Sequence, residues 1–417
     1  MQNNNASGKK VKLLEGFPWE TIAVFLGGIQ ILRKRFFSEE KFPGTQKNII
    51  AAIHEKRFSD REKYVITGGH FSDLYVRNLG IFYADLLDNA VAKSDLQKRQ
   101  AIGIKTLTLD LQLLEQAKRE PTTFTKLFGN FYMAKNIYAR ASDSLYAILY
   151  TLEKLQENRA TKHIAEKLLE KYHKTLARLI AQYVADVFDT HTGILKKNVY
   201  LASARDGVKR ESSFYDNVIF WATLTLAKKM QLTNQSQDFL NTLRKKILTT
   251  FWDTKEKIFL DDLSAHAQKQ HTFCADSFIV LATGFLDIKN AADKKKLANM
   301  VAYVEKNKLD QPFPIHYTKE NTKHNLHFWV RHMAMSYMGE SIWSHWGMEY
   351  IKALILLDKK AKAKKFLKIY EQNIEKYGGY PELYDTDGNI FRTFFYKSVL
   401  HTGWVINFEK TLSLANS

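Results

Sequence analysis

Residues 161–193 decide the fold, and they read TKHIAEKLLEKYHKTLARLIAQYVADVFDTHTG. Their apolar residues recur at steps of three and four, with Lys, Glu and Arg between them, as on an amphipathic helix with one buried face. The helical pattern ends at Phe188-Asp189-Thr190, and Gly193 favours a turn directly after it. A similar pattern is present in segments 101–118, 233–251, 291–307 and 356–376. The sequence therefore predicts a set of long helices with charged outer faces.

An aromatic residue close to an Asp at the end of such a helix occurs four times. These aspartates are at positions 60, 189, 253 and 385, so the gaps between them are 129, 64 and 132 residues. The gaps correspond to two, one and two units of about 65 residues, which is typical of a repeat architecture. Where the Asp is missing, the sequence reads Phe124-Thr125-Lys126 and Tyr317-Thr318-Lys319. Six such units predict six helical hairpins closed into one toroid.

A second and less charged helix is expected after each turn. The segments VIFWATLTLA (218–227), FIVLATGFL (278–286) and MEYIKALILL (348–357) are apolar on nearly all sides, which indicates burial of both faces. Polar outer helices would then enclose apolar inner helices, and the inner N-termini would surround a pocket at one mouth. Residues 196–201 and 257–263 predict short hairpins at the rim. The expected fold class is all-α, an (α/α)6 toroid.

The composition favours one large domain. The sequence has six prolines and no Pro-, Gly- or Ser-rich linker, so we divide it into an N-terminal segment with the first outer helix (1–40) and a single catalytic barrel (41–417). Cys274 is the only cysteine, which excludes an internal disulfide. Because neither a leader-like segment nor a stretch long enough to span a bilayer is apparent, we expect a soluble cytoplasmic protein.

The net charge of +18, from 62 basic and 44 acidic residues, could serve a polyanionic partner such as nucleic acid or an anionic membrane. The lysine runs at 294–296 and 359–365 lie in helical stretches, however, as solvated outer faces do. No nucleic-acid-binding motif accompanies them. We therefore expect neither nucleic acid nor a membrane as a partner.

Three segments resemble the six-hairpin glycosidases: ESSFYDNVIFW (211–221), ESIWSHWGMEYIKALILL (340–357) and GGYPELYDTDG (378–388). The nearest group is that of glycogen-debranching glucosidases, trehalases and processing α-glucosidases. In that group a Glu-Ser-Gly motif followed by Asp-Asn carries the general acid, and a late Pro-Glu carries the general base. The resemblance thus implies Asp216 as the acid and Glu382 as the base. Here Glu211 and Asp216 are one residue further apart than in the motif, and Ser213 replaces its Gly.

The residues themselves give a parallel argument. Hydrolysis of a glycoside needs one carboxylic acid to protonate the leaving oxygen and a second carboxylate to activate water or attack the anomeric carbon. Asp216 at an inner-helix start and Glu382 after Pro381 would both face the mouth of the barrel. Asp216 is equally suited to be a helix cap, and Glu382 to a salt bridge at the rim.

Aromatic rings, hydroxyl acceptors and hydroxyl donors near these starts are candidates for binding the sugar. They are Asp73, Tyr75, Arg77, Tyr215, Asn217, Trp343, His345, Trp346, His401 and Trp404. Core packing is the alternative for the aromatic members, and an ion pair with Asp73 is the alternative for Arg77. His324, His327 and His332 lie close together, but without an HExxH motif or a Cys partner we assign no metal and no cofactor.

The resemblance implies a glycoside hydrolase that acts on an α-glucoside or a short α-glucan, with the inverting route of the group that it resembles. One alternative is a sugar epimerase on the same toroid, with acid and base among His327, His332, His345 and His401. It predicts that loss of a histidine is more harmful than loss of Glu382. The other alternative is a non-catalytic toroid that binds carbohydrate.

Overall fold

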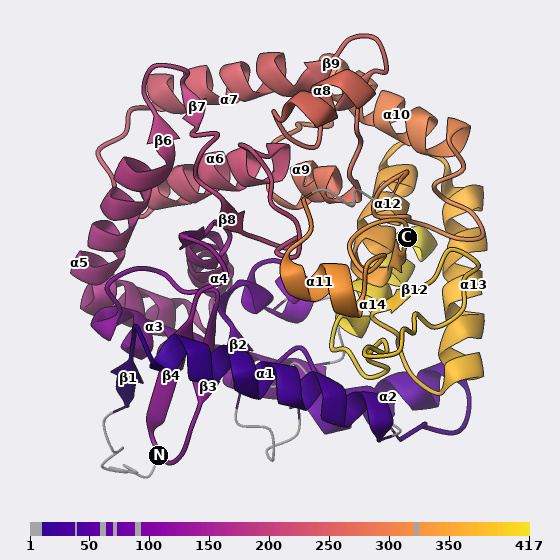
Figure 1. Cartoon of the computed structure of the whole chain (residues 1–417), viewed down its shortest axis with the longest axis horizontal. Helices are drawn as coiled ribbons and strands as arrows, with labels where there is room; N and C mark the ends of the chain where they lie inside the picture. Colours follow the sequence, from indigo (N-terminus) through magenta and orange to yellow (C-terminus); the bar gives the residue numbers. More distant parts are fainter. Residues whose placement is uncertain (1–10, 38–39, 59–63, 70–72, 88–92, 321–324) are drawn as a thin grey trace.

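The computed structural model describes residues 11–37, 40–58, 64–69, 73–87, 93–320 and 325–417, and they form a ring of paired helical elements (Figure 1). The outer helices are α2 (Gln46–Phe58), α3 (Lys93–Gln116), α5 (Lys162–Val187), α7 (Gln237–Phe251), α10 (Ala291–Lys306) and α13 (Lys360–Tyr377). The inner elements are the 3-10 helices η1 (Val76–Leu79) and η2 (Ala84–Leu87), α4 (Ser144–Glu157), α6 (Phe214–Lys229), η3 (Ala275–Phe278) with α9 (Ile279–Ala282), α12 (Ser344–Leu356) and α14 (Val405–Asn416). The predicted all-α toroid is confirmed.

The difference between outer and inner helices follows from their sequences. In α5, Leu176, Leu179 and Tyr183 are buried while the Lys and Glu residues face outwards. In α6 and α12 nearly every residue is buried, because each of these helices packs both on an outer helix and on its inner neighbours. The apolar sequences of the inner helices thus reflect burial on both faces.

The ring closes where its first and last outer helices meet. Helix α13 contacts α2, and α2 contacts α3 on its other side. The backbone N–H of Gln46 donates to Glu375 Oε1 at 2.9 Å, and that of Phe42 to the carbonyl of Gly378 at 2.9 Å. These bonds join segments more than 300 residues apart.

The repeated aromatic–Asp pair marks a turn, which directly follows an outer helix at Asp189 and Asp253 and lies eight residues beyond the end of α13 at Asp385. Strands β6 (Phe188–Asp189) and β7 (Ile194–Leu195) pair in one hairpin, and β9 (Trp252–Asp253) and β10 (Ile258–Phe259) in another. The side chains of Asp189, Asp253 and Asp385 each accept the N–H of the residue two positions later, at 2.8–3.0 Å. An Asp suits this position because its short side chain mimics a backbone turn. Asp60 lies outside the described residues.

Further short elements cover the rim. Strands β1 (Lys12–Leu14), β4 (Phe131–Lys135), β3 (Thr123–Lys126) and β2 (Leu74–Tyr75) form a sheet in that order. Strands β5 (Arg140–Ala141) and β8 (Leu201–Ala202) pair in parallel, and β11 (Ile342–Trp343) and β12 (Leu383–Tyr384) antiparallel. The short helices at the rim are α8 (Ala265–Gln270) and α11 (Phe328–Met333). The rim hairpin predicted at 257–263 is confirmed through β10, whereas 196–201 contributes only Leu201 to a strand, and that strand pairs in parallel.

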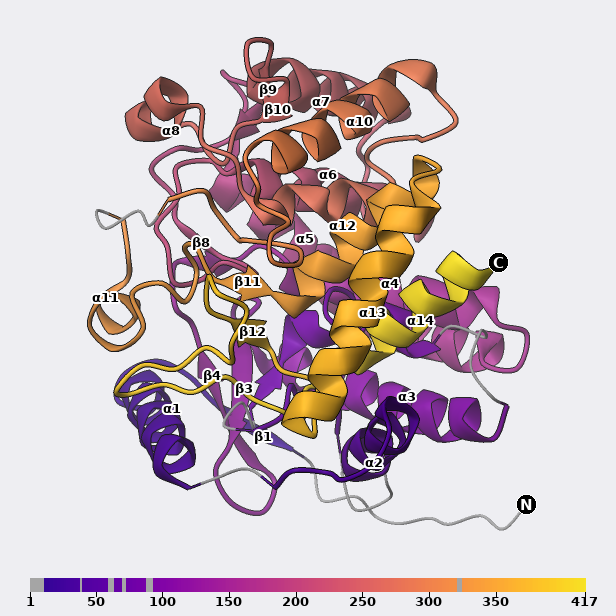
Figure 2. The same cartoon turned by 90° about the vertical axis from the view of Figure 1, so that its right-hand side faces the viewer.

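Helix α1 (Trp19–Phe36) contacts β4 and lies at the rim, so the expectation that residues 1–40 hold the first outer helix is wrong in this detail. That place in the ring belongs to α2. Figure 2 shows α1, α11, β11 and β12 on one side of the molecule and the C-terminus of α14 on the other. Among the described residues, no helix combines the length and the apolar character needed to cross a bilayer.

Candidate active site

A cavity of about 150 Å³ lies where the inner elements begin. Arg77 belongs to η1 and Asp206 to the loop before α6. Trp343 directly precedes α12, and Trp404 directly precedes α14. The full lining is Ile31, Thr67, Tyr75, Arg77, Asn78, Phe82, Ala204, Asp206, Val330, Met333, Ala334, Tyr337, Met338, Trp343, Glu382, Tyr396 and Trp404. Segments far apart in the sequence therefore meet at the expected mouth of the barrel.

Glu382 is one of two carboxylates that line the cavity within the described part of the chain. Its backbone is fixed on both sides: its N–H donates to Val399 O at 2.9 Å, and its carbonyl accepts from Ser344 N at 3.1 Å. Its side chain accepts one phenol hydrogen bond on each oxygen, from Tyr337 at 2.6 Å and from Tyr396 at 2.5 Å. Hydrogen bonds to a carboxylate favour its ionised form. Glu382 is thus held in one orientation, where sequence reasoning placed a catalytic base.

Asp206 is the second carboxylate in the lining, and its side chain is 15% exposed. Arg77 Nη2 donates to Asp206 Oδ2 at 2.8 Å. Burial alone would lower the pKa of Arg77, but Asp206 and Asp143 raise it, so Arg77 is a permanent cation. The pKa of the buried Tyr337 phenol lies well above its ordinary range because of its burial, and the charges of Glu382 and Asp206 raise it further. Tyr337 therefore interacts electrostatically with both carboxylates.

The loop that presents Asp206 is held from below. Arg205, the preceding residue, donates through Nε and Nη2 to the carbonyl of Met338 at 3.1 and 2.9 Å and through Nη1 to Asp261 at 2.5 Å. A Cβ on Gly207 would lie 2.6 Å from Val330 Cγ2, so only glycine allows the loop to pass this close to α11. Asp206 consequently has a rigid support.

The cavity wall carries stacked aromatic rings. Trp404 stacks on Phe82 with ring centroids 4.7 Å apart and on Trp343 at 6.0 Å. Trp343 Nε1 donates to the carbonyl of Tyr337 at 2.6 Å, which fixes the indole. Flat aromatic faces of this kind suit the C–H faces of a sugar ring. Trp343 and Trp404 both line the cavity, and their predicted contact with a sugar stays a prediction.

Tyr75 and Arg77 also line the cavity, whereas Asp73 supports them from behind. Lys135 Nζ donates to Asp73 Oδ2 at 2.8 Å and lies 5.7 Å from the centre of the Tyr75 ring. The Arg77 guanidinium covers the same ring at 5.0 Å. The predicted alternative for Arg77, an ion pair with Asp73, is not what forms, because Asp73 pairs with Lys135 and Arg77 with Asp206.

Asp216, the predicted acid, does not line the cavity. It is 3% exposed and accepts the Ser213 hydroxyl at 2.5 Å, while Ser213 caps α6 by accepting Asp216 N at 3.0 Å. Burial raises the pKa of Asp216, and Arg210 lowers it. Asn217 bonds to Ser213 O at 2.8 Å and to Leu195 N at 3.0 Å. The polar side chains at the start of α6 thus bond to that helix start and to the neighbouring strand rather than facing the cavity.

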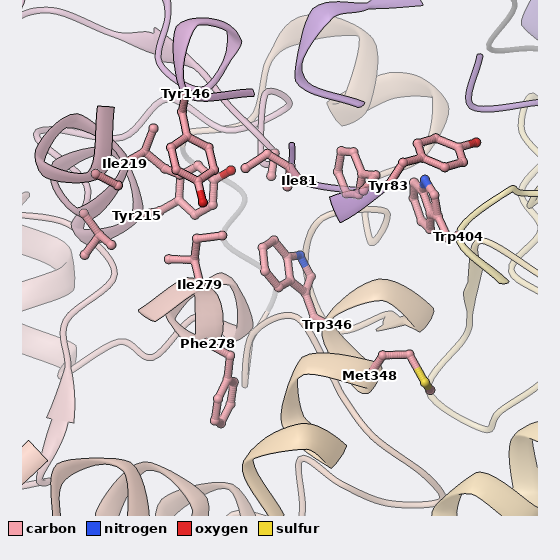
Figure 3. Packing of buried hydrophobic residues seen from close by; sticks show 14 of the residues in the cluster. Ile81, Tyr83, Tyr146, Tyr215, Ile219, Phe278, Ile279, Trp346, Met348 and Trp404 are labelled. Carbon is pink, nitrogen blue, oxygen red and sulfur yellow. The ribbon is translucent and has the colours of Figure 1, made fainter. Parts of the chain in front are cut away.

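Three further predicted contacts are core residues. Tyr215 donates to Asp143 at 3.2 Å, and its ring packs at 6.2 Å from Trp346 (Figure 3). His345 is bonded to Asn407 at 2.9 Å, and burial lowers its pKa to about 3. Trp346 is completely buried. These side chains lie among the inner helices rather than in the cavity.

His401 lies at the closure of the ring. Its imidazole stacks on Phe42 at 4.4 Å and approaches Lys56 Nζ at 3.3 Å. Burial lowers its pKa to about 3. None of the four histidines proposed for an epimerase lines the cavity; they are His327, His332, His345 and His401. His324 lies outside the described residues.

A cluster of side chains of the kinds that bind metal ions lies near the Asp206 loop. It consists of Asp261, Cys274 and Asp276. Arg210 Nη1 donates to Asp276 at 2.7 Å and to Asp261 at 3.1 Å, and Arg205 also pairs with Asp261. Burial raises the pKa of the Cys274 thiol well above its ordinary value, which keeps it protonated. Two guanidinium groups thus supply the positive charge that a metal would bring.

Sequence reasoning missed Asp206, Tyr337 and Tyr396. Asp206 stands in Ala204-Arg205-Asp206-Gly207, ten residues before Asp216, in the loop that leads to the same inner helix. An Arg-Asp-Gly in that loop was the available signal, because Gly permits close backbone approach. The two tyrosines have no local motif and reach Glu382 only through the folded chain.

Comparison with solved structures places this chain among six-hairpin glycosidase folds. A rhamnosidase from Klebsiella oxytoca with rhamnose bound is similar over 90% of this chain and 65% of its own, with TM-score 0.55 and 14% identity. A GH63 mannosylglycerate hydrolase from Thermus thermophilus is similar over 89% of this chain and 100% of its own, with TM-score 0.57 and 9% identity.

A metal-independent α-mannosidase from Streptococcus pneumoniae, in complex with α-1,6-mannobiose, is similar over 95% of this chain and 98% of its own (TM-score 0.54, 11% identity). Neither a protein-family model nor a curated protein matches the chain. At these identities the similarity establishes the toroid fold. The narrower resemblance to glucosidases and trehalases stays a prediction.

Proposed function

We propose that this protein hydrolyses an α-linked glycoside in the cavity at the barrel mouth, with Asp206 as general acid and Glu382 as general base. The observation that carries the proposal is the presence of these two carboxylates in one cavity lined by stacked indoles. They come from separate hairpins, and each is held by hydrogen bonds from cavity residues. Similar solved structures named as glycosidases support the same reaction class.

The hydrogen bonds of Glu382 suggest the role of base for it, and Asp206 takes the remaining role of acid. Two phenol donors favour the ionised form of Glu382, as a base that activates water requires. Arg77 stabilises the carboxylate that Asp206 becomes once its proton has passed to the leaving oxygen. Tyr337 keeps its proton, because its pKa is raised, and its hydrogen bond holds Glu382 in place while that carboxylate takes a proton from water. Asp206 replaces Asp216 in the acid role predicted from the sequence.

The substrate is an α-linked hexoside or deoxyhexoside, with Trp343 and Trp404 as its stacking surface. The similar structures are named for rhamnose, mannosylglycerate and α-mannose, and the sequence predicts an α-glucoside. An inverting route requires about 6.5–9.5 Å between the two carboxyl groups, which leaves room for a water molecule. We expect this route, and proton NMR of the first-formed anomer distinguishes it from retention.

The test uses paired aryl glycosides with a poor and a good leaving group, in the α-mannosyl, α-rhamnosyl and α-glucosyl series. Glu382→Gln should abolish hydrolysis of both members, because neither can react without activated water. Asp206→Asn should lose its activity on the glycoside with the poor leaving group. It should retain most of its activity on the glycoside with the good leaving group, because that group departs without being protonated. Asp216→Asn is the matched control. Undiminished hydrolysis by Glu382→Gln would refute the proposal, and loss of both members in Asp206→Asn would refute the assigned role.

A further inference from the structure

Exposed apolar side chains gather on the segments that surround the cavity mouth. Ten of the fourteen large hydrophobic residues that are exposed in the described part of the chain lie on α1 and its flanks (17–37), on α11 and the residues after it (328–335), or on the loop 391–397. We call these three segments the apolar rim. Its most exposed rings are Phe17, Phe25, Phe36, Phe37, Phe328 and Phe394, each at least 64% exposed.

The three segments form one connected surface. Arg35 Nε on α1 donates to Thr393 O at 3.0 Å, and Thr393 Oγ1 donates to Met333 O on α11 at 2.6 Å. In Figure 2 the two helices lie on the same side of the molecule, with the loop drawn in yellow running between them. The same segments also contribute Ile31, Met333 and Tyr396 to the cavity lining. One face of the rim therefore points inwards to the cavity and the other outwards to solvent.

The outward face of α1 is an apolar stripe. Val24, Phe25 and Ile29 are exposed, whereas Ala23 on the opposite face is buried. Helices of water-soluble proteins normally show charged residues on the outward face, as α5 does here. Contiguous exposed apolar surface of this kind marks a site of contact with a protein or a membrane.

The charge of the rim distinguishes these partners. Its three segments contain six Lys or Arg residues and one Glu, and the Lys and Arg residues include Arg33, Arg331 and Arg392, which are exposed. A second copy of the chain would bring two such basic surfaces together, which repel each other. Exposed phenylalanines beside basic residues are the features of a helix that lies in the interface of an anionic bilayer.

We propose that the apolar rim binds the surface of an anionic lipid membrane, with the phenylalanines among the acyl chains and the basic residues at the headgroups. The cavity mouth then faces the membrane, so saccharides attached to lipid are within its reach. This departs from the expectation, drawn from composition alone, that a membrane is not a partner. The binding itself does not depend on whether the cavity is hydrolytic.

Co-sedimentation with sucrose-loaded vesicles tests this. The wild-type protein should bind vesicles of equimolar phosphatidylcholine and phosphatidylglycerol, bind phosphatidylcholine alone much less, and be released by added NaCl. The double variant Phe25→Ser/Phe394→Ser should bind about tenfold more weakly, since each ring contributes buried apolar area. Arg33→Glu should weaken binding severalfold.

Two surface variants away from the rim are matched controls. Leu414→Ser removes an exposed apolar side chain from α14, and Lys364→Glu reverses an exposed charge on α13. Both should bind as the wild type does, and so should Glu382→Gln, which separates membrane binding from catalysis. Equal binding by the rim variants and the wild type, equal binding to neutral vesicles, or no sedimentation at all would overturn the proposal. So would a dimer in sedimentation velocity that the rim variants dissociate, because the rim would then join two copies.

Discussion

The inner-helix starts and the cavity loops both carry buried acidic residues, but they use them differently. At the starts of α4 and α6, Asp143 and Asp216 are almost completely buried and bond to Tyr215 and Ser213. In the loops, Asp206 and Glu382 line a cavity and accept hydrogen bonds from cavity side chains. The aspartates at the helix starts are held by neighbouring buried side chains, and Asp143 makes no capping bond to α4, whereas a carboxylate on a loop braced from behind remains directed at a ligand.

The largest expected effect separates Asp206 from Asp216. Asp206→Asn should lower kcat for a substrate with a poor leaving group by about 10²–10⁴-fold, because proton transfer to the leaving oxygen is lost. Asp216→Asn should change kcat by less than about tenfold, since the Asn side chain can still bond Ser213. Steady-state kinetics on both variants decides between them. The reverse order of effects would restore Asp216 as the acid.

A smaller effect is expected from the phenols that hold Glu382. Tyr396→Phe should lower kcat by about 10–100-fold, with little change in Tm, because Glu382 loses one of its two phenol donors. Tyr350→Phe is the matched control, since its hydroxyl bonds Asp310 at 3.1 Å away from the cavity. That variant should lose about 0.5–1.5 kcal/mol of stability with this hydrogen bond, since Lys362 still pairs with Asp310, and it should retain kcat. Equal kcat losses in both variants would mean that Tyr396 has only a general structural role.

These predictions depend on a site that the sequence revealed only in part. Helical periodicity and the spacing of Asp189, Asp253 and Asp385 predicted the toroid, because each Asp closes the same local turn. Glu382 could be proposed as a site residue because it follows Pro381 outside any helix, where helix capping does not account for a carboxylate. Asp206 was missed although it stands before Gly207, because its partner Arg77 lies 129 residues away and the Glu-Ser motif at Glu211 drew the assignment to Asp216 instead.

The wrong predictions have a common physical cause. Tyr215, His345 and Trp346 carry the chemistry of a sugar site, but helical spacing alone does not tell whether a side chain points to the barrel mouth or to a neighbouring inner helix. Here they fill the core, and burial lowers the pKa of His345 to about 3, so its ring stays neutral well below neutral pH. The direction in which such a side chain points is determined only when all six hairpins are packed together.

The smallest expected effect concerns the helix-start carboxyl Asp143. Burial raises its pKa to about 7, although Arg77 lowers it, whereas the unfolded chain has the ordinary value of 3.8. Between about pH 4 and pH 7 the folded state therefore holds a proton that the unfolded state has lost, and stability falls as pH rises. Asp143→Asn should remove this dependence, so its Tm relative to wild type should rise by a few degrees from pH 5 to pH 8. Thermal melts of both proteins at the two pH values measure this, and parallel Tm changes would contradict it.

The central claim is that a glycoside lies between Asp206 and Glu382. A crystal structure of the Glu382→Gln variant with an oligosaccharide that the wild-type protein hydrolyses tests it most directly. We expect the scissile oxygen within hydrogen-bond distance of Asp206, a water between the sugar and residue 382, and a ring stacked on Trp343 or Trp404. A saccharide bound against Asp216, or outside this cavity, would contradict the account.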